Sequence, residues 1–381
     1  MSASRVIHSA RLVTGGKVTE NAWVRSEGGT VTAVGTGDTW TSADEVVDAR
    51  AVAGTGAVLA PGFIDLHCHG GGGASHEDGP DAIRQARALH AAHGTTRAVI
   101  SLVAAPLADT ARRVAEIAAL SRTDPGILGS HLEGPFLDPA HHGAHDPALL
   151  LAPDPAGLAR VLAAGEGTVR QITLAPELPG AAALIAEARA AGAAVAVGHT
   201  SADADTARAA FDAGATILTH AFNAMPGIHH RAPGPVLAAA GDPRVTLEAI
   251  ADGVHLHDDI VRLLWEIAPG RVALVTDAMA AAGAADGDYD LGAVAVTVTG
   301  GVARTRGTGA IAGSTLTQDA ALRRAVGAGI ALPDAVTALT ATPARALGEA
   351  ARLGQLAPGF ADDAVLLDDA LTVQRVFAPR A

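Results

Sequence analysis

The fold of the chain is decided most clearly by residues 193–220, AAVAVGHTSADADTARAAFDAGATILTH. Two short apolar runs, AAVAVG and ATILT, flank an Ala-rich segment of helical length at 203–213. Such alternation is typical of βα units, in which a parallel sheet is covered by helices on both faces. His199 follows the first run and His220 the second. The stretch therefore predicts a strand–helix–strand unit with an imidazole at the end of each strand.

The same alternation extends from residue 58 over most of the chain. Eight apolar runs are predicted as strands at 58–66, 96–103, 126–132, 169–175, 193–198, 215–219, 245–250 and 271–276. Predicted helices lie between them at 80–93, 107–120, 155–164, 180–191, 203–213, 233–240 and 257–267, and the stretch 315–350, broken by Pro333 and Pro343, supplies the last ones. Eight such repeats predict a closed (β/α)₈ TIM-type barrel. An open doubly wound sheet is the alternative, but no GxGxxG motif follows the first run.

The two ends of the chain follow a different pattern. Residues 1–57 alternate β-branched and polar residues between glycine turns, which is typical of a small antiparallel sheet, and residues 355–381 return to this style. We therefore predict a small β-sandwich domain built from both termini, flanking a barrel of residues 58–354. An insertion at 291–311 contains a Gly-Gly turn and predicts a β-hairpin.

Composition excludes several classes of function. Hydrophobic residues make up 49% of the 381 and charged residues 18%, so a large aliphatic core is expected. The net charge of −13 repels polyanions, which argues against a nucleic-acid partner. No stretch approaches 18 uninterrupted apolar residues and no signal-peptide pattern opens the chain, so a cytoplasmic protein without a membrane partner is expected. Lys17 is the only lysine, which disfavours a catalytic or metal-bridging lysine.

Metal-ligand side chains follow the predicted strands. In an extended strand, residues two apart share a face, so His67 and His69 can present two imidazoles while Cys68 points away. Such a pair taken alone is more often packed or solvated than ligating. The carboxyl ends of barrel strands converge on one face, however, and four more candidate ligands stand at equivalent strand ends. The full predicted set is His67, His69, Glu133, His199, His220 and Asp277.

The residue types in this set indicate the chemistry. Imidazole and carboxylate without thiolate suit Zn²⁺, Fe²⁺, Mn²⁺, Co²⁺ or Ni²⁺. Six ligands are too many for one tetrahedral metal that keeps a position open for water, so we predict two metals bridged by Glu133, with zinc the first choice. Such metals activate water and polarise a carbonyl, while a nearby carboxylate moves the proton. Asp277 is the candidate for that proton shuttle.

Seven segments of the sequence together resemble the N-acetylglucosamine-6-phosphate deacetylases of the amidohydrolase superfamily. They are PGFIDLHCHGGGG, HLEGPFLDPAHHGAHDP, VGHT, THAFNAMPGIHHRAPG, ADGVHLH, VTDAM and IAGSTLT, and they span nearly the whole chain. The resemblance implies metal-dependent hydrolysis of N-acetyl-D-glucosamine 6-phosphate to D-glucosamine 6-phosphate and acetate, in amino-sugar catabolism or cell-wall sugar recycling. Asp277 would act first as general base and then as general acid.

The same resemblance implies roles for individual residues. Glu133, His199 and His220 would bind the metal found throughout the family, and His67 and His69 would complete a second position. His145 would contact the acetamide carbonyl. His255 and Arg231 would hold the sugar phosphate, with Arg231 reaching across a homodimer interface. Asn223 and Ala224 would contact the phosphate or the sugar.

Three alternatives stay open at this point. The same motifs fit an N-acetylgalactosamine-6-phosphate deacetylase. A cyclic amidase or a nucleobase deaminase would use the same metals. The lack of a bridging lysine weighs against the cyclic amidase, and the HLEGPF and HAFNAM segments weigh against the nucleobase deaminase. A non-catalytic metal-binding relative is the third, and the presence of both Asp277 and His145 argues against it.

Overall fold

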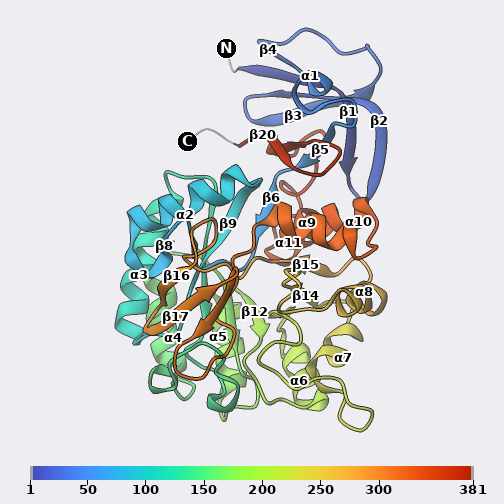
Figure 1. The fold of residues 1–381 in the computed structure, drawn as a ribbon. Helices are drawn as coiled ribbons and strands as arrows, with labels where there is room; N and C mark the ends of the chain where they lie inside the picture. Colours follow the sequence, from blue (N-terminus) through green and yellow to red (C-terminus); the bar gives the residue numbers. More distant parts are fainter. Residues whose placement is uncertain (1–2, 379–381) are drawn as a thin grey trace.

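The computed structural model describes residues 3–378, which form a barrel and a second sheet at the chain ends (Figure 1). The barrel strands lie in the order β15-β14-β13-β12-β11-β10-β9-β6, and every neighbouring pair is parallel. Their bounds are β6 Phe63–Asp65, β9 Thr95–Leu102, β10 Ile127–Glu133, β11 Val169–Leu174, β12 Ala194–Val197, β13 Ile217–Leu218, β14 Thr246–Ala249 and β15 Val272–Leu274. The predicted (β/α)₈ architecture is confirmed.

The barrel is closed between β6 and β15 by few backbone contacts and by one side chain. Beyond the strand ends, Cys68 and Ala278 form an isolated parallel bridge. The carboxylate of Asp65 accepts hydrogen bonds from the Thr276 hydroxyl at 2.6 Å and from the Thr276 and His67 backbone N–H groups at 3.2 Å each. Burial raises the pKa of Asp65 to about 6 although these hydrogen bonds oppose the shift. Asp65 thus links the first and last barrel strands.

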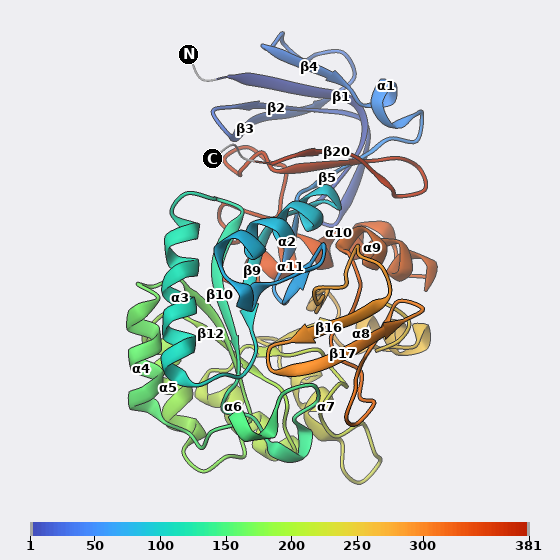
Figure 2. The same cartoon turned by 60° about the vertical axis from the view of Figure 1, so that its left-hand side comes forward.

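Helices cover the outside of the barrel (Figure 2). Asp154 and Asp203 cap α4 and α6 by accepting backbone N–H groups, and Pro333 and Pro343 lie in first turns, where a missing N–H costs nothing. The seven helices predicted between strands are found within two residues of their expected ends. The bounds are α2 Pro80–Ala92, α3 Leu107–Ser121, α4 Pro155–Ala164, α5 Ala181–Ala190, α6 Ala204–Ala213, α7 Gly234–Ala240, α8 Asp258–Ile267, α9 Gln318–Gly327, α10 Leu332–Leu339 and α11 Ala341–Ala346.

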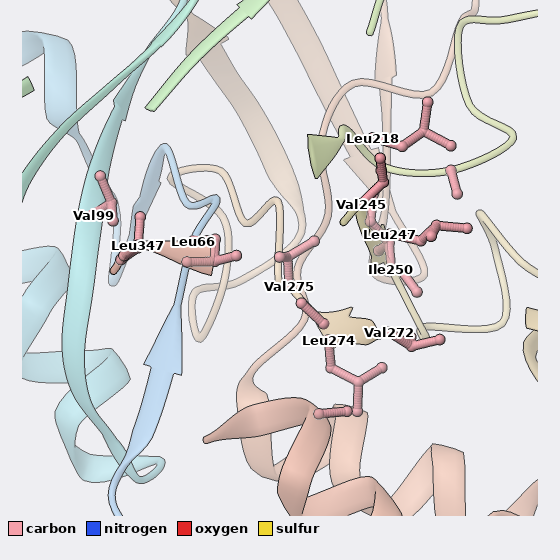
Figure 3. Packing of buried hydrophobic residues seen from close by; sticks show 14 of the residues in the cluster. Leu66, Val99, Leu218, Val245, Leu247, Ile250, Val272, Leu274, Val275 and Leu347 are labelled. Atoms are coloured by element: carbon pink, nitrogen blue, oxygen red, sulfur yellow. The ribbon is translucent and has the colours of Figure 1, made fainter. Parts of the chain in front are cut away.

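Aliphatic side chains fill the space around the barrel strands. Leu218 of β13, Leu247 of β14 and Leu274 of β15 are fully buried and belong to one large cluster, part of which is drawn in Figure 3. Such burial stabilises the fold by about 25 cal/mol for each Å² of apolar surface removed from water. The small-aliphatic core expected from the composition is therefore present.

The chain ends form one branched, mixed sheet in the order β20-β19-β5-β1-β2-β3, with β4 also paired to β1. The predicted β unit built from both termini is confirmed, but β1 pairs in parallel with β4 and β5, so the sheet is not purely antiparallel. Its strands are β1 Ser4–Thr14, β2 Lys17–Glu27, β3 Thr30–Thr36, β4 Glu45–Asp48, β5 Val58–Pro61, β19 Ala364–Leu367 and β20 Val373–Phe377, with a short helix α1 at Ala49–Ala53. The parts of the prediction at 1–2 and 379–381 lie outside the described residues.

The strand predicted at 58–66 is wrong as a single element. Val58–Pro61 belongs to the terminal sheet as β5, and the barrel begins only at Phe63. The two sheets meet at Gly62, where an added Cβ would lie 2.1 Å from the Thr96 hydroxyl oxygen. Only glycine fits this close approach, and the continuous apolar run hid the change of sheet.

The insertion forms three strands, β16 Gly287–Leu291, β17 Val294–Thr299 and β18 Val302–Thr305. The predicted hairpin is confirmed by the antiparallel pair β17 and β18, which turns at Gly300 and Gly301 with positive φ at both. β16, sequence GDYDL, was missed because its alternating acidic residues do not resemble a buried strand. Smaller elements are β7 Gly70–Gly71, β8 Ala74–Ser75 and the 3₁₀ turns η1 His76–Asp78, η2 Pro139–His141 and η3 Pro147–Leu149.

A buried ion pair joins the barrel to the terminal sheet and yields a stability prediction. Arg97 of β9 donates two hydrogen bonds to Asp363, and the two side chains are only 6% and 7% exposed. Replacing Arg97 by methionine would leave the Asp363 carboxylate buried without its partner, which typically costs about 3–5 kcal/mol. We expect a loss of this size in the free energy of unfolding, measured by urea denaturation. The double variant Arg97→Met/Asp363→Leu should recover most of it, and a single variant as stable as the wild type would contradict the prediction.

Within residues 3–378, no helix is both long enough and apolar enough to cross a membrane.

Candidate active site

The six predicted ligands converge at the carboxyl ends of the barrel strands, with Glu133 at their centre. Its Oε1 lies 3.3 Å from Nε2 of His67. The same oxygen lies 3.2 Å from Nε2 of His199 and 3.2 Å from Nε2 of His220. Its Oε2 lies 3.2 Å from Nε2 of His69. Glu133 therefore stands between two pairs of histidines, one that follows β6 and one that follows β12 and β13.

The distances between the imidazoles fit nitrogen ligands that share a cation. Nε2 of His67 and Nε2 of His69 are 2.9 Å apart, and the corresponding atoms of His199 and His220 are 3.0 Å apart. Nitrogen lone pairs that face one another so closely need a proton or a cation between them. Asp277 adds a carboxylate, because its Oδ1 lies 3.4 Å from Nε2 of His67. Four imidazoles and two carboxylates thus form a donor set suited to divalent cations.

The charged groups of the site shift one another's pKa values. Burial alone would lower the pKa of His67, but the carboxylates of Glu133 and Asp277 raise it well above its usual value. Burial would likewise raise the pKa of Glu133, but the charge of His67 and hydrogen bonds from His145, His199 and His220 hold it well below its usual range. The site therefore favours a carboxylate anion at its centre.

Backbone strain gathers at three of the strand ends. His199, His220 and Asp277 have positive φ angles of 48°, 27° and 47°, in a region that residues other than glycine rarely adopt. Such conformations cost on the order of 1–3 kcal/mol each and persist where the surrounding fold enforces them. Here each left-handed residue lies two or three positions past the end of its strand, and its side chain lies at the common centre.

A cavity of about 340 Å³ opens onto these ligands. Leu291 and Ile311 of the insertion form part of its wall. Predicted site residues that line it are His69, Glu133, His145, His199, His220, Asn223, Ala224, His255 and Asp277. His67 is fully buried beneath them. Arg231 is not among the described residues that line the cavity, because it lies on an exposed turn with its guanidinium 2.7 Å from Nε2 of His230.

His145 is held in one tautomer. The backbone N–H of Ala104 donates to its Nδ1 at 3.3 Å, so the proton of the neutral ring lies on Nε2, 3.3 Å from Oε2 of Glu133. Burial lowers the pKa of His145 to about 4, against the pull of Glu133. At neutral pH the residue is therefore an uncharged N–H donor beside the ligands.

The other cavity residues are also fixed by hydrogen bonds. Nδ1 of His255 lies 2.7 Å from Oδ2 of Asp252, and the His255 side chain is only 6% exposed. The side-chain amide of Asn223 donates to the carbonyl groups of His220 and Ala221 at 3.2 Å each. Both side chains face the cavity with little freedom to move, which suits contacts to a bound ligand.

Comparison with known proteins adds to this geometry. Residues 58–378 match the model of the amidohydrolase family. The chain belongs to the amidohydrolase family. N-acetylgalactosamine-6-phosphate deacetylase of Escherichia coli O157:H7 is 41% identical over 84% of this chain and 86% of its own length. The human N-acetylglucosamine-6-phosphate deacetylase is 35% identical over 97% of this chain and 93% of its own.

A solved structure of the same family has nearly the same fold. N-acetyl-D-glucosamine-6-phosphate deacetylase from Mycobacterium smegmatis superposes with a TM-score of 0.92 at 43% identity, covering 98% of both chains. A mutant of that enzyme in complex with N-acetyl-D-glucosamine-6-phosphate gives a TM-score of 0.93 and covers 99% of this chain and 98% of that one.

Several polar residues of this amidohydrolase were missed because they stand in the middle of apolar strands. Glu248 of β14 and His131 of β10 are fully buried and contact His67, and Gln171 of β11, also fully buried, donates a hydrogen bond to Glu248. An ionisable residue inside an apolar run, as in VTLEAI, was the available signal. The carbonyl of His141, a residue given no role from the sequence, accepts the hydrogen bond of His199 Nδ1 at 2.9 Å.

Proposed function

We propose that this amidohydrolase removes the acetyl group of N-acetyl-D-glucosamine 6-phosphate, giving D-glucosamine 6-phosphate and acetate. One observation carries the proposal: two histidine pairs surround Glu133, and this centre opens onto a cavity lined by a carboxylate, Asp277, and an uncharged N–H donor, His145. The relatives that are 35–43% identical to the chain and bear the name of this activity support the choice of substrate.

The metal positions follow from the donor atoms. His199, His220 and Glu133 would hold one divalent cation, and His67 and His69 with Glu133 and Asp277 the other. Cations bound there would supply an activated water and polarise the acetamide carbonyl. Zinc is our first choice, and iron, manganese, cobalt and nickel suit the same nitrogen and oxygen ligands.

Asp277 is proposed to move the proton of the reaction. As the water oxygen bonds to the carbonyl carbon, the Asp277 carboxylate takes the proton that the water loses. The carbon–nitrogen bond then breaks, and Asp277 returns that proton to the leaving amine. The immediate products are the free amino sugar phosphate and acetic acid, which releases its remaining proton to become acetate.

His145 is proposed to stabilise the negative charge that forms on the carbonyl oxygen. His145 lines the cavity, its Nε2–H lies beside the ligands at 3.3 Å from Oε2 of Glu133, and its low pKa keeps the ring uncharged. Replacing it by alanine should lower kcat by about 10²–10³-fold, the usual effect of losing one such donor, with little change in metal content. Steady-state acetate release measures this. The exposed His257, changed to alanine, is the control, and near-wild-type turnover by His145→Ala would remove it from this role.

The phosphate end of the substrate is proposed to contact His255, Asn223 and Ala224 of one chain and Arg231 of the second chain of a homodimer. The position of Arg231 outside its own cavity agrees with a role in trans. We also propose a cytoplasmic location, which is supported by the single, buried cysteine, since such a thiol suits a reducing compartment.

Mixed dimers test whether Arg231 acts in trans. The variants Arg231→Ala and Asp277→Asn should each be impaired, because one lacks the phosphate contact and the other the proton shuttle. After both are unfolded and refolded together, a mixed dimer contains one site with both groups intact, so activity should return. The separately refolded variants are the control, and a mixture no more active than their average would show that Arg231 serves its own chain or none.

One assay tests the proposed function. Acetate release is measured from N-acetylglucosamine 6-phosphate, from its unphosphorylated form and from N-acetylgalactosamine 6-phosphate, with metal content determined on the same preparation. We expect turnover of the glucosamine phosphate and little of the unphosphorylated sugar. Release from none of the three would overturn the deacetylase proposal.

The galactosamine epimer is the second candidate substrate. It is favoured by the 41% identity to the Escherichia coli enzyme named for it. A higher kcat/KM for N-acetylgalactosamine 6-phosphate in the same assay would establish it as the preferred substrate.

A further inference from the structure

Glu248 is a fully buried carboxylate for which the proposed reaction has no role. It lies on β14, whose residues are all buried, and its side chain has no exposed surface. Placing a carboxylate in such surroundings costs several kcal/mol unless other groups compensate. The partners that Glu248 has acquired therefore indicate what it does.

Every described polar contact of the Glu248 carboxylate is to a hydrogen-bond donor. Oε1 accepts the side-chain amide N–H of Gln171 at 2.7 Å. Oε2 accepts the backbone N–H of His220 at 3.3 Å and lies 3.3 Å from Nδ1 of His67. An ionised carboxylate can only accept hydrogen bonds, and three donors around its two oxygens fit that form. One side chain thus contacts a ligand from each of the two histidine pairs.

The contact with Glu248 determines which nitrogen of His67 can bind a metal. Because Nδ1 faces a carboxylate oxygen, Nδ1 carries the ring proton. Nε2, which lies 3.3 Å from Oε1 of Glu133, keeps its lone pair for the centre of the site. The ring is also contacted edge to face by His131, with 4.7 Å between ring centroids. A carboxylate behind a ligating histidine fixes its tautomer and orientation and makes it a stronger ligand.

The other three histidines lack such a partner. Nδ1 of His199 donates to a backbone carbonyl, that of His141. The Nδ1 atoms of His69 and His220 are buried without a hydrogen-bond partner within residues 3–378. Among these four histidines, His67 is therefore the one whose Nδ1 faces a carboxylate. His67 and His69 form one of the two histidine pairs, so this contact belongs to that pair alone.

We infer that Glu248 is a positioning residue for the metal position at His67 and His69, and that it decides whether this second position is filled. The inference rests on the proposed metal site. The position at His199 and His220 depends on it less, because there Glu248 contacts only a backbone N–H group.

Metal titration tests the inference without any substrate. Wild-type chain freed of metal is titrated with Co²⁺, and bound metal is counted after equilibrium dialysis. We expect two equivalents for the wild type. Glu248→Ala should bind the first equivalent with unchanged affinity and the second about 10–100-fold more weakly. Glu248→Gln, which keeps an amide oxygen toward His67, should lie between the two.

Two further variants make the outcome specific. His69→Ala removes the second position directly, so adding Glu248→Ala to it should cause no further loss of Co²⁺. Asp319→Asn alters a buried carboxylate elsewhere, on α9, and should bind two equivalents. If Glu248→Ala fails to fold, by circular dichroism, Glu248→Gln decides in its place.

Three results would overturn the inference: one equivalent bound by the wild type, unchanged affinities in the Glu248 variant that folds, or equal weakening of both equivalents. A chain that shows the expected pattern but releases no acetate would instead overturn the proposed function alone.

Discussion

Asp277→Asn is expected to lower kcat for acetate release by about 10²–10⁴-fold, the range that general acid–base catalysis contributes. Asparagine has nearly the same shape and tolerates the positive φ of 47° at this position, so the strand end should keep its conformation. It cannot, however, accept a proton from water and return it to the amine. Turnover should therefore be lost although the fold is retained.

Three measurements separate this explanation from damage to the site. Metal content should stay at or near the wild-type value, because asparagine still offers an Oδ1 oxygen to the position that His67, His69 and Glu133 hold. Affinity for N-acetylglucosamine 6-phosphate, measured by calorimetry, should also be retained. Asp290→Asn, at an exposed position of the insertion, is the control for loss of a negative charge. A variant that keeps more than about a tenth of wild-type turnover would exclude Asp277 from proton transfer.

The barrel could be predicted from the sequence because its signals are local. Each βα unit, such as that of residues 193–220, carries its own apolar run, helix and glycine, and eight units in one chain have few ways to pack. The site followed from one rule, that the carboxyl ends of parallel strands meet. This rule brought Glu133 of β10 and Asp277, which follows β15, to within reach of the same histidine.

The features that were missed depend on contacts that a linear pattern does not encode. At the change of sheet, a glycine is required at position 62 by the close approach of the Thr96 side chain, which is distant in sequence. Glu248 and Gln171 lie on strands buried on both faces, where the alternation of inward and outward residues disappears from the sequence. The contact proposed between Arg231 and a second chain is likewise outside what the pattern of one chain encodes.

Replacing Glu133 by glutamine is expected to remove both metals. Its two oxygens lie within 3.3 Å of Nε2 of His67, His69, His199 and His220, so both histidine pairs share one carboxylate. Glutamine keeps the size of the side chain but offers a single neutral oxygen and two N–H donors that point at nitrogen lone pairs. Acetate release should fall to the background rate.

The Glu133 variant differs from the other two carboxylate variants in what it binds. Asp277→Asn should retain metal and lose turnover, Glu248→Ala should lose one metal, and Glu133→Gln should lose both while circular dichroism stays unchanged. Metal analysis after dialysis against a weak chelator, with activity measured on the same samples, distinguishes the three. If Glu133→Gln takes up two equivalents with wild-type affinity, Glu133 is not the bridge, and the two histidine pairs must bind their cations independently.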